Sequence, residues 1–357
     1  MSEQEDAITP EGERYASPPS ELDYLDVDPP QPGHAVAIAD GLLWARIPLP
    51  MELAHINVWL LEDADGWTLV DTGMAAEPCR EAWVTLEREV LGRRGLRRIL
   101  VTHDHPDHMG LSPWLQRKHG AEVWMSAIAH QSSAEFLATE SSRIYARMAT
   151  FLAMHGMPVD AATAQRPMPG HDTWFDGVPE LTRATAGGDA LGTPGRTWDV
   201  VETSGHCRGH LCLHDAAGRL LVSGDQVLPG ISPNVSVLSS RPDADPLREF
   251  LASLTRLEQC AGDTLVLPSH GRPFRGLHHR TASLRAHHEQ QLGGLREACA
   301  EARTAFELLP AMFGRPLRGF HRVLAMGETV AHLNYLWSAG LVERSVDTGG
   351  VIRFVRA

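Results

Sequence analysis

The sequence predicts a mixed α/β protein whose strands carry metal ligands on the loops that follow them. Predicted strands and amphipathic helices follow one another from about residue 34 onward. The apolar run at residues 99–101 leads directly into H-D-H-P-D-H at residues 103–108, which places three imidazoles and two carboxylates in six positions. Imidazole and carboxylate are ligands that divalent zinc, iron and manganese prefer. A buried strand ending in this loop therefore predicts one bound metal ion and favours two.

Residues 1–33 are predicted to form an acidic, proline-rich N-terminal arm. They hold nine acidic residues, one basic residue and six prolines, a composition that cannot bury much apolar surface. We expect a mobile or loosely docked segment, and a solvated tail without function is the favoured interpretation.

The central domain is predicted to span residues 34–285. Apolar and β-branched runs bounded by turn residues predict strands at 42–47, 56–61, 67–70, 99–101, 122–125, 197–202, 211–214, 220–223 and 264–267. Apolar residues at helical spacing predict helices at 77–91, 112–119, 246–259 and 278–306.

Residues 126–172 interrupt this pattern with a segment rich in Ala, Met, Ser and Gln. We expect two helices ending near Gly156 and Gly170. Met148, Phe151 and Met154 would form an apolar surface there, either as ordinary helix core or as a lid that contacts an apolar substrate. Both interpretations stay open at this point.

Residues 286–357 are predicted to form a small separate domain. Helices are expected at 305–313 and 320–338, followed by two strands around 347–350. Helix, helix and hairpin in this order are typical of a winged-helix unit. Such a tail could bind nucleic acid, pack over the site or form a homodimer contact, and we favour the last two.

The composition narrows the class of protein. The 357 residues carry a net charge of −13, which does not attract polyanions, and 43% hydrophobic residues, as in soluble proteins. Five scattered cysteines without CxxC spacing predict reduced thiols. Neither a membrane span nor a secretory signal is evident. We therefore expect a cytoplasmic protein with a small-molecule substrate, and nucleic acid is the weaker alternative.

Three more metal-capable residues stand where a predicted strand gives way to a glycine-bearing loop. They are His206 in S-G-H-C-R-G-H, Asp225 in S-G-D and His270 in S-H-G. Strand ends that present such ligands at one edge of a sheet predict a single site.

These motifs, in this order and preceded by Asp71-Thr72-Gly73, resemble the metallo-β-lactamase-fold hydrolase superfamily over about residues 36–285. The resemblance implies a four-layer αββα sandwich and a hydrolase that depends on a dinuclear metal centre. The tail is similar to that of a subgroup that includes a lactamase-like endoribonuclease, and GHxxGH is shared with the glyoxalase II branch.

The resemblance also implies a set of ligands. One metal ion would bind His103, His105 and His206, and the second would bind Asp107, His108 and His270, with Asp225 bridging the two. Asp71 would orient a ligand histidine from behind. His210 would be structural, and Cys207 would be a buried filler or, alternatively, a thiolate ligand. Zinc is the default metal, with manganese and iron as alternatives.

Two adjacent cations lower the pKa of a shared water and polarise the bond under attack. Asp107 could steer the proton of that water, and Asp225 would be the other catalytic carboxylate. Thioesters, esters and lactones are the favoured substrates. Arg272 and Arg275, with Arg280, could hold a carboxylate or a coenzyme A phosphate, or could form a solvated helix start.

Two alternatives to an acyl hydrolase remain. A nuclease or phosphodiesterase would use the winged-helix-like tail. A metal-site regulator without catalytic activity is the other, and the full set of ligands argues against it. The histidine pairs at 278–279 and 287–288 are expected on an exposed helix rather than at a metal.

Overall fold

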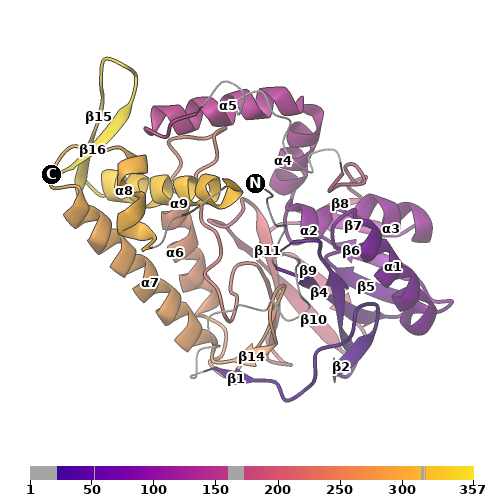
Figure 1. Cartoon of the computed structure of the whole chain (residues 1–357). Coiled ribbons are helices and arrows are strands. Elements are labelled where there is room, and N and C mark those ends of the chain that lie inside the picture. The colour runs from indigo at the N-terminus through magenta and orange to yellow at the C-terminus, as the bar shows by residue number, and fades with distance from the viewer. Residues whose placement is uncertain (1–21, 52, 160–172, 315–316, 318) are drawn as a thin grey trace, which may run out of the picture.

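The computed structural model describes residues 22–51, 53–159, 173–314, 317 and 319–357. Within these residues, two seven-stranded sheets lie against each other with helices on their outer faces (Figure 1). The first sheet contains, in spatial order, β2 (Ala35–Ala39), β3 (Leu42–Pro48), β4 (His55–Asp63), β5 (Gly66–Val70), β6 (Leu96–Leu100), β7 (Glu122–Met125) and β8 (Arg183–Ala184). The second contains β1 (Asp23–Tyr24), β14 (Phe274–Arg275), β13 (Leu265–Pro268), β12 (Leu220–Gly224), β11 (His210–Asp215), β10 (Arg196–Thr203) and β9 (Ala190–Thr193).

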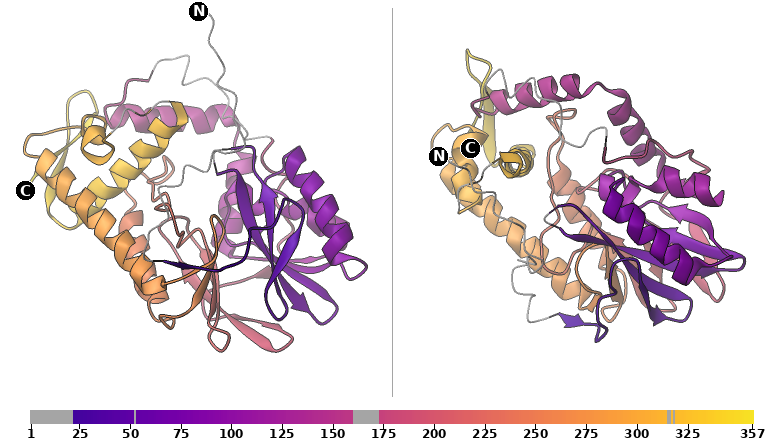
Figure 2. Two further views of the ribbon diagram at one scale, coloured as in Figure 1. Left: turned by 60° about the horizontal axis from the view of Figure 1, so that its bottom comes forward. Right: turned by 45° about the vertical axis from the view of Figure 1, so that its right-hand side comes forward.

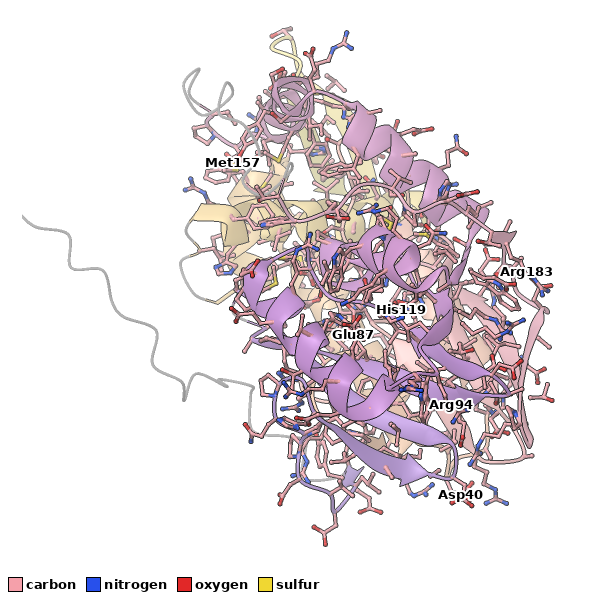
Figure 3. The ribbon with its side chains drawn as sticks, turned by 90° about the vertical axis from the view of Figure 1, so that its right-hand side faces the viewer. Asp40, Glu87, Arg94, His119, Met157 and Arg183 are labelled. Atoms are coloured by element: carbon pink, nitrogen blue, oxygen red, sulfur yellow. The ribbon has the colours of Figure 1, made fainter. Side chains whose placement is uncertain are left out.

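Helices connect the parallel strands of each sheet. β5, β6 and β7 run parallel, as do β12 and β13, and parallel neighbours need a crossover connection. The crossovers are α1 (Glu77–Leu86) with a π-helical turn (Glu87–Leu91), then α3 (Ser112–His119), and in the second sheet α6 (Pro246–Leu257). The helix predicted at 77–91 ends in a π-helical turn, and a hydrogen bond of 2.8 Å between Nε2 of His119 and Oε1 of Glu87 connects this turn to α3 (Figure 3).

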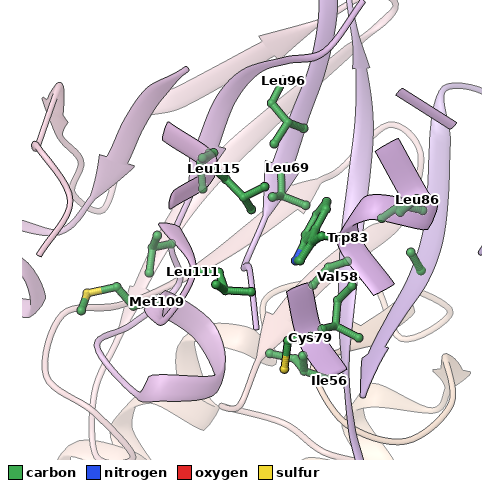
Figure 4. Packing of buried hydrophobic residues seen from close by; sticks show 14 of the residues in the cluster. Ile56, Val58, Leu69, Cys79, Trp83, Leu86, Leu96, Met109, Leu111 and Leu115 are labelled. Atoms are coloured by element: carbon green, nitrogen blue, oxygen red, sulfur yellow. The ribbon is translucent and has the colours of Figure 1, made fainter. Parts of the chain in front are cut away.

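The outer face of the first sheet is covered by α1 and α3. Trp83 of α1 is fully buried and lies over Val58 and Leu69 of the sheet (Figure 4). Its indole N–H donates to the carbonyl oxygen of Thr72 at 2.7 Å. Burying a side chain of this size contributes about 3 kcal/mol, and the hydrogen bond fixes the backbone just after β5.

The two sheets enclose three fully buried tryptophans between them. Trp44 and Trp59 stack with ring centroids 6.2 Å apart, and Trp198 of the opposite sheet is fully buried in the same cluster. On the far side of the second sheet, Phe250 of α6 and Leu284 of α7 (Leu277–Ala298) pack together. Helix, sheet, sheet and helix follow in this order, so the predicted four-layer αββα sandwich is confirmed.

The insertion at 126–172 contributes α4 (Ala127–Ala138) and α5 (Ser141–Met154). A helix ends near Gly156 as predicted, because α5 stops at Met154 with His155 as its C-cap; α4 before it is a separate helix that ends at the extended backbone of Thr139. Residues 160–172, with the predicted end near Gly170, lie outside the described part of the chain. α5 runs across the molecule to meet the C-terminal helices (Figure 2).

The C-terminal segment contains the predicted elements in the predicted order. They are α8 (Ala305–Met312), α9 (Gly319–Ser338), β15 (Val342–Val346) and β16 (Ile352–Arg356). The helix expected at 278–306 is wrong at its end, because α7 stops at Ala298 and a capping box between Thr304 and Glu307 starts a new helix. α7 runs through the predicted division at 285/286, and the winged-helix class stays a prediction.

One histidine of α7 differs from the prediction of an exposed helix. His288 is fully buried, with Nδ1 3.0 Å from Nε2 of His332 and its ring edge against Phe250. The prediction was wrong because α7 is covered by α6 and α9.

The end of the predicted N-terminal arm is docked. Leu22 is buried and β1 pairs with β14, while residues 1–21 lie outside the described part. All five cysteines are free thiols; the cytoplasmic location stays a prediction. Among the described helices, none is both long and apolar enough to cross a bilayer.

Candidate metal centre

The seven predicted ligands follow the carboxyl ends of four strands. The first loop follows β6, and the loops after β10, β12 and β13 carry His206, Asp225 and His270. The last three strands belong to the second sheet. The two sheets therefore meet at one edge with their polar loops facing each other.

Three imidazole nitrogens form the first group. Nδ1 of His105 lies 3.0 Å from Nε2 of His103 and 3.1 Å from Nε2 of His206, and the two Nε2 atoms are 3.3 Å apart. Ligands of a tetrahedral zinc ion lie about 3.3 Å from one another. Nδ1 of His206 donates to the carbonyl oxygen of Asn234 at 2.9 Å, which leaves Nε2 as the ligand atom.

A second group lies beside the first. Oδ2 of Asp107 is 3.5 Å from Nε2 of His108 and 3.3 Å from Nε2 of His270. Each ring is held through its other nitrogen: Nδ1 of His108 lies 2.8 Å from Oδ2 of Asp71, and Nδ1 of His270 lies 2.8 Å from the carbonyl oxygen of His55. These contacts direct both Nε2 atoms inward.

Asp225 lies between the two groups. Its Oδ2 is 3.4 Å from Nε2 of His206 and 3.5 Å from Nε2 of His108, and its Oδ1 is 3.4 Å from Nε2 of His270. One carboxylate thus contacts both groups, which is the position of a bridging ligand.

Unpaired buried atoms test whether the site fits metal ions. Nε2 of His108, Nε2 of His270 and Oδ1 of Asp225 are buried and have no hydrogen-bond partner in the described part of the chain. Such atoms cost about 1–3 kcal/mol each unless something binds them. Their convergence, with the three close groups of His, Cys and Asp, fits divalent cations.

The electrostatic environment differs between the two groups. Burial and neighbouring imidazoles lower the pKa of His103 well below its usual range and that of His105 to about 4, so both are neutral, as ligands must be. Burial acts against protonation of His108 too, but Asp107, Asp225 and Asp71 outweigh it and raise its pKa well above the usual range. Without metal, these carboxylates favour a proton on His108, and a bound cation would displace that proton.

Two features of the backbone fix these positions. Asp71 has φ of 62°, and its Oδ1 accepts the backbone N–H of Thr102 at 2.8 Å. Gly224 has φ of 54°, and a Cβ there would lie 2.4 Å from Nε2 of His210. That same Nε2 accepts the backbone N–H of Asp225 at 3.1 Å. His210 therefore positions Asp225, and this hydrogen bond is the physical basis of the structural role predicted for His210.

Cys207 stands beside the first group. Its thiol donates to Oδ1 of Asp104 at 3.2 Å and lies 3.4 Å from Nε2 of His105. Burial and the nearby carboxylates raise the pKa of this thiol well above its usual range. Its sulfur also lies close to the ligand atoms of His103, His105 and His206, so the buried filler and the thiolate ligand both stay predictions.

The metal groups open into a cavity of about 410 Å³. Apolar side chains, among them Leu53, Leu228, Ile231, Leu238 and Leu324, line much of it. A second cavity of about 600 Å³ lies between α4, α5 and α9. The two cavities share the lining residues Ser132, Ser236, Leu238 and Leu324, so they adjoin.

The predicted substrate contacts fall into two sets. Met148 and Phe151 line the second cavity, whereas Met154 does not and is 37% exposed. Arg272 and Arg275 line neither cavity. Arg272 donates to the carbonyl oxygen of Leu25 at 2.9 Å and Arg275 to that of Asp263, so these side chains hold the edge of the second sheet.

Arg280 and two cavity arginines complete the placement. Arg280 is buried and donates to the carbonyl oxygens of Leu228 and Ile231, so it fixes a wall of the metal cavity. Sequence reasoning missed Arg208 and Arg241, which do line that cavity. The signal for Arg208 was its place two residues after His206; Arg241 carried none.

Two groups of potential metal ligands at the shared edge of an αββα sandwich are typical of a class of metal-dependent hydrolases. The family model described as "Metallo-beta-lactamase superfamily" matches residues 52–270. A second family model, "Metallo-beta-lactamase-like, C-terminal domain", matches residues 292–357. The chain belongs to the metallo-beta-lactamase superfamily of hydrolases, as the resemblance of its motifs implied.

Similar proteins include one of known structure and two whose names state an activity. A beta-lactamase domain protein from Burkholderia ambifaria is 40% identical, with a TM-score of 0.86 over 94% of this chain and 97% of the other. The acyl-coenzyme A thioesterase MBLAC2 of Homo sapiens is 26% identical over 67% of this chain and 81% of its own length. A hydroxyacylglutathione hydrolase from Rhizobium johnstonii is 33% identical over 51% of this chain, which spans about half (52%) of that relative.

Proposed function

We propose that this protein hydrolyses acyl thioesters at a centre that holds two divalent metal ions, zinc by default. The observation that carries this proposal is the adjoining pair of cavities. One contains the metal groups and the other is a mainly apolar chamber between α4, α5 and α9. A carbonyl at the metal groups can therefore be joined to an apolar chain in the second chamber.

The second chamber suits an acyl chain. Phe136, Ile144, Met148, Phe151 and Val323 contribute apolar surface to it. Each methylene group moved from water into such a chamber contributes about 0.8 kcal/mol. The unbranched methionine can adapt to chains of different length. The helices α4 and α5 of the segment predicted as a lid would therefore form part of the wall of this chamber.

The relatives support a thioester. The names of the human and Rhizobium relatives both denote hydrolysis of an acyl thioester. They differ in the thiol part, which is coenzyme A in one name and glutathione in the other. The proposal for this chain therefore rests on the acyl side, where the apolar chamber lies.

The side chains around the centre have distinct tasks. Two divalent cations held by the two groups would activate water as a nucleophile and polarise the thioester carbonyl. Asp107 lines the cavity and lies beside His108 and His270, so it can accept a proton from the attacking water. Asp225 keeps the two groups together, and Asp71 keeps His108 oriented.

The test compares short and long acyl chains. Purified protein loaded with zinc should hydrolyse butyryl- and dodecanoyl-coenzyme A, and a chelator should abolish both activities. Leu324→Trp would place a bulky ring where the cavities adjoin; Leu324 is 36% exposed, so the change costs little stability. It should raise KM for the dodecanoyl substrate far more than for the butyryl one.

The matched control is Val84→Trp, an exposed site on α1, which should change neither constant. Cleavage confined to phosphodiesters or RNA would replace the proposal by the nuclease alternative. Equal effects of Leu324→Trp on both chain lengths would remove the acyl chamber.

A further inference from the structure

A third hollow, of about 420 Å³, lies beside the metal cavity. Four arginines contribute to its lining against two glutamates: Arg208, Arg241, Arg248, Arg256, Glu202 and Glu249. Arg208, Arg241 and Glu249 also line the metal cavity, so the two spaces adjoin. A cluster of arginines stands out on a chain whose net charge is −13.

The four arginines differ in whether their side chains bind other groups of the protein. Arg248 donates to Asp245 at 3.0 Å and to Ser338 at 2.9 Å, and Arg256 donates to the carbonyl oxygen of Glu202 at 2.8 Å. Arg208 and Arg241 are exposed, and neither forms a side-chain hydrogen bond or ion pair with any described residue. Their guanidinium groups are therefore available to an anion at the boundary of the two spaces.

The position of Arg208 links this pair to the reaction centre. It follows the ligand His206 by two residues on the same loop, and Gly205 of that loop packs so closely that a Cβ would lie 2.3 Å from Phe250. The close packing fixes the loop, so Arg208 starts from a defined position beside the metal groups. Guanidinium binds phosphate oxygens in pairs, which makes arginine a preferred phosphate ligand.

Resting on the proposed function, we propose that the arginine hollow binds a phosphorylated leaving group, so that the substrate is an acyl thioester of a phosphate-bearing thiol. Its acyl chain would occupy the chamber beside α5, and its phosphates would reach Arg208 and Arg241. Water adds to the carbonyl carbon, the carbon–sulfur bond breaks, and the products are a carboxylate, a free thiol and a proton. A thiol such as glutathione, with carboxylates only, would use the pair less well.

The test is the double variant Arg208→Ala/Arg241→Ala with one acyl chain on three thiols. Octanoyl-coenzyme A and octanoyl-phosphopantetheine carry phosphate, and octanoyl-N-acetylcysteamine carries none. The variant should raise KM about tenfold for the coenzyme A thioester, since two charge-assisted contacts at an exposed site are lost. KM for the N-acetylcysteamine thioester and kcat for every substrate should stay as in the wild type.

The control variant is Arg93→Ala/Arg97→Ala, which removes two exposed arginines at the opposite end of β6 and should change nothing. A KM effect shared by octanoyl-phosphopantetheine would assign the pair to the phosphate nearest the thiol; an effect limited to coenzyme A would assign it to the nucleotide phosphates.

Equal KM changes on all three thiols, or none on any, would overturn the inference while thioesterase activity remained. A wild-type enzyme that cleaves none of them when loaded with metal would instead overturn the proposed function. Inhibition by a short RNA that the double variant loses, without thioester selectivity, would assign the hollow to nucleic acid and also overturn the inference.

Discussion

Asp71→Asn isolates the contact that orients one ligand. Oδ2 of Asp71 lies 2.8 Å from Nδ1 of His108 and accepts the hydroxyl of Thr102 at 2.9 Å, while Oδ1 accepts the backbone N–H of Thr102. The residue has φ of 62°, which asparagine tolerates and most side chains do not. The substitution therefore keeps the backbone and one acceptor, and changes the charge and the partner of His108.

The expected loss is confined to one metal ion. Losing an outer contact to a ligand histidine weakens metal binding about 10–100-fold, or about 1.4–2.8 kcal/mol. Asp71 contacts His108 of the second group directly, whereas it reaches the first group only through the hydroxyl of Thr102, which lies 3.0 Å from Nδ1 of His103. The ion of the second group should therefore leave at a lower chelator concentration, and the other should remain.

Chelator titration with metal analysis of the retained protein measures this difference. The wild type should release two ions per chain over a narrow range, and Asp71→Asn should release them in two steps. The control is Asp63→Asn. Asp63 is a buried residue at the end of β4 that lies away from the metal groups, where its carboxylate accepts the hydroxyl of Thr68, and it does not touch those groups. Unchanged release in Asp71→Asn, or a two-step release in the control, would refute the reasoning.

Three further predictions concern stability and geometry. Burial raises the pKa of Glu328 from 4.5 to about 7. The carboxyl group therefore stays protonated to a higher pH in the folded state than in the unfolded state, and the free energy of unfolding falls as the pH rises between those values. Glu328→Gln should raise the free energy of unfolding by about 1–3 kcal/mol in urea titrations at about pH 8.5, with no gain at about pH 4. Thr304→Ala removes the side-chain acceptor of a capping box, Oγ1, which accepts the backbone N–H of Glu307 at 3.2 Å, and leaves the backbone N–H of residue 304 able to donate to Glu307. It should cost about 1 kcal/mol in the same assay. Gly224→Ala would force a Cβ against His210 at positive φ; it should cost about 1–3 kcal/mol and lower the metal content, because Asp225 follows directly. A metal content equal to the wild type would show that the loop can shift without moving Asp225.

The candidate ligands that the structure brings together could be selected from the sequence because their position depends on local rules. A strand that ends in a loop places the next few side chains at the sheet edge, and β6, β10, β12 and β13 all end in this way. The strands themselves were predicted to within a few residues, since both faces of each sheet are covered and the apolar runs are nearly continuous. Short edge strands such as β8 and β9 carried no such signal.

Features that depend on tertiary packing were not predicted. Arg272 and Arg275 follow His270 so closely in sequence that a place at the site was expected, but the chain turns into β14 and pairs with β1. Arg241 lies far along the chain from any motif and reaches the cavity only through the loop after β12. His288 has the polar neighbours of a surface helix, and the docking of both α6 and α9 buries it.

The arrangement of the ligands explains why the centre needs both halves of the sandwich. The first group combines His103 and His105 of the first sheet with His206 of the second, and the second group likewise adds His270 to Asp107 and His108. Neither sheet alone presents three ligands to one ion together with the bridging carboxylate. Metal ions bound only by the folded chain stabilise it by about 4 kcal/mol when present at about a thousand times their dissociation constant. That stabilisation acts across the interface between the sheets, which also share one apolar core, so chelation should lower the free energy of unfolding of the whole sandwich in urea titrations.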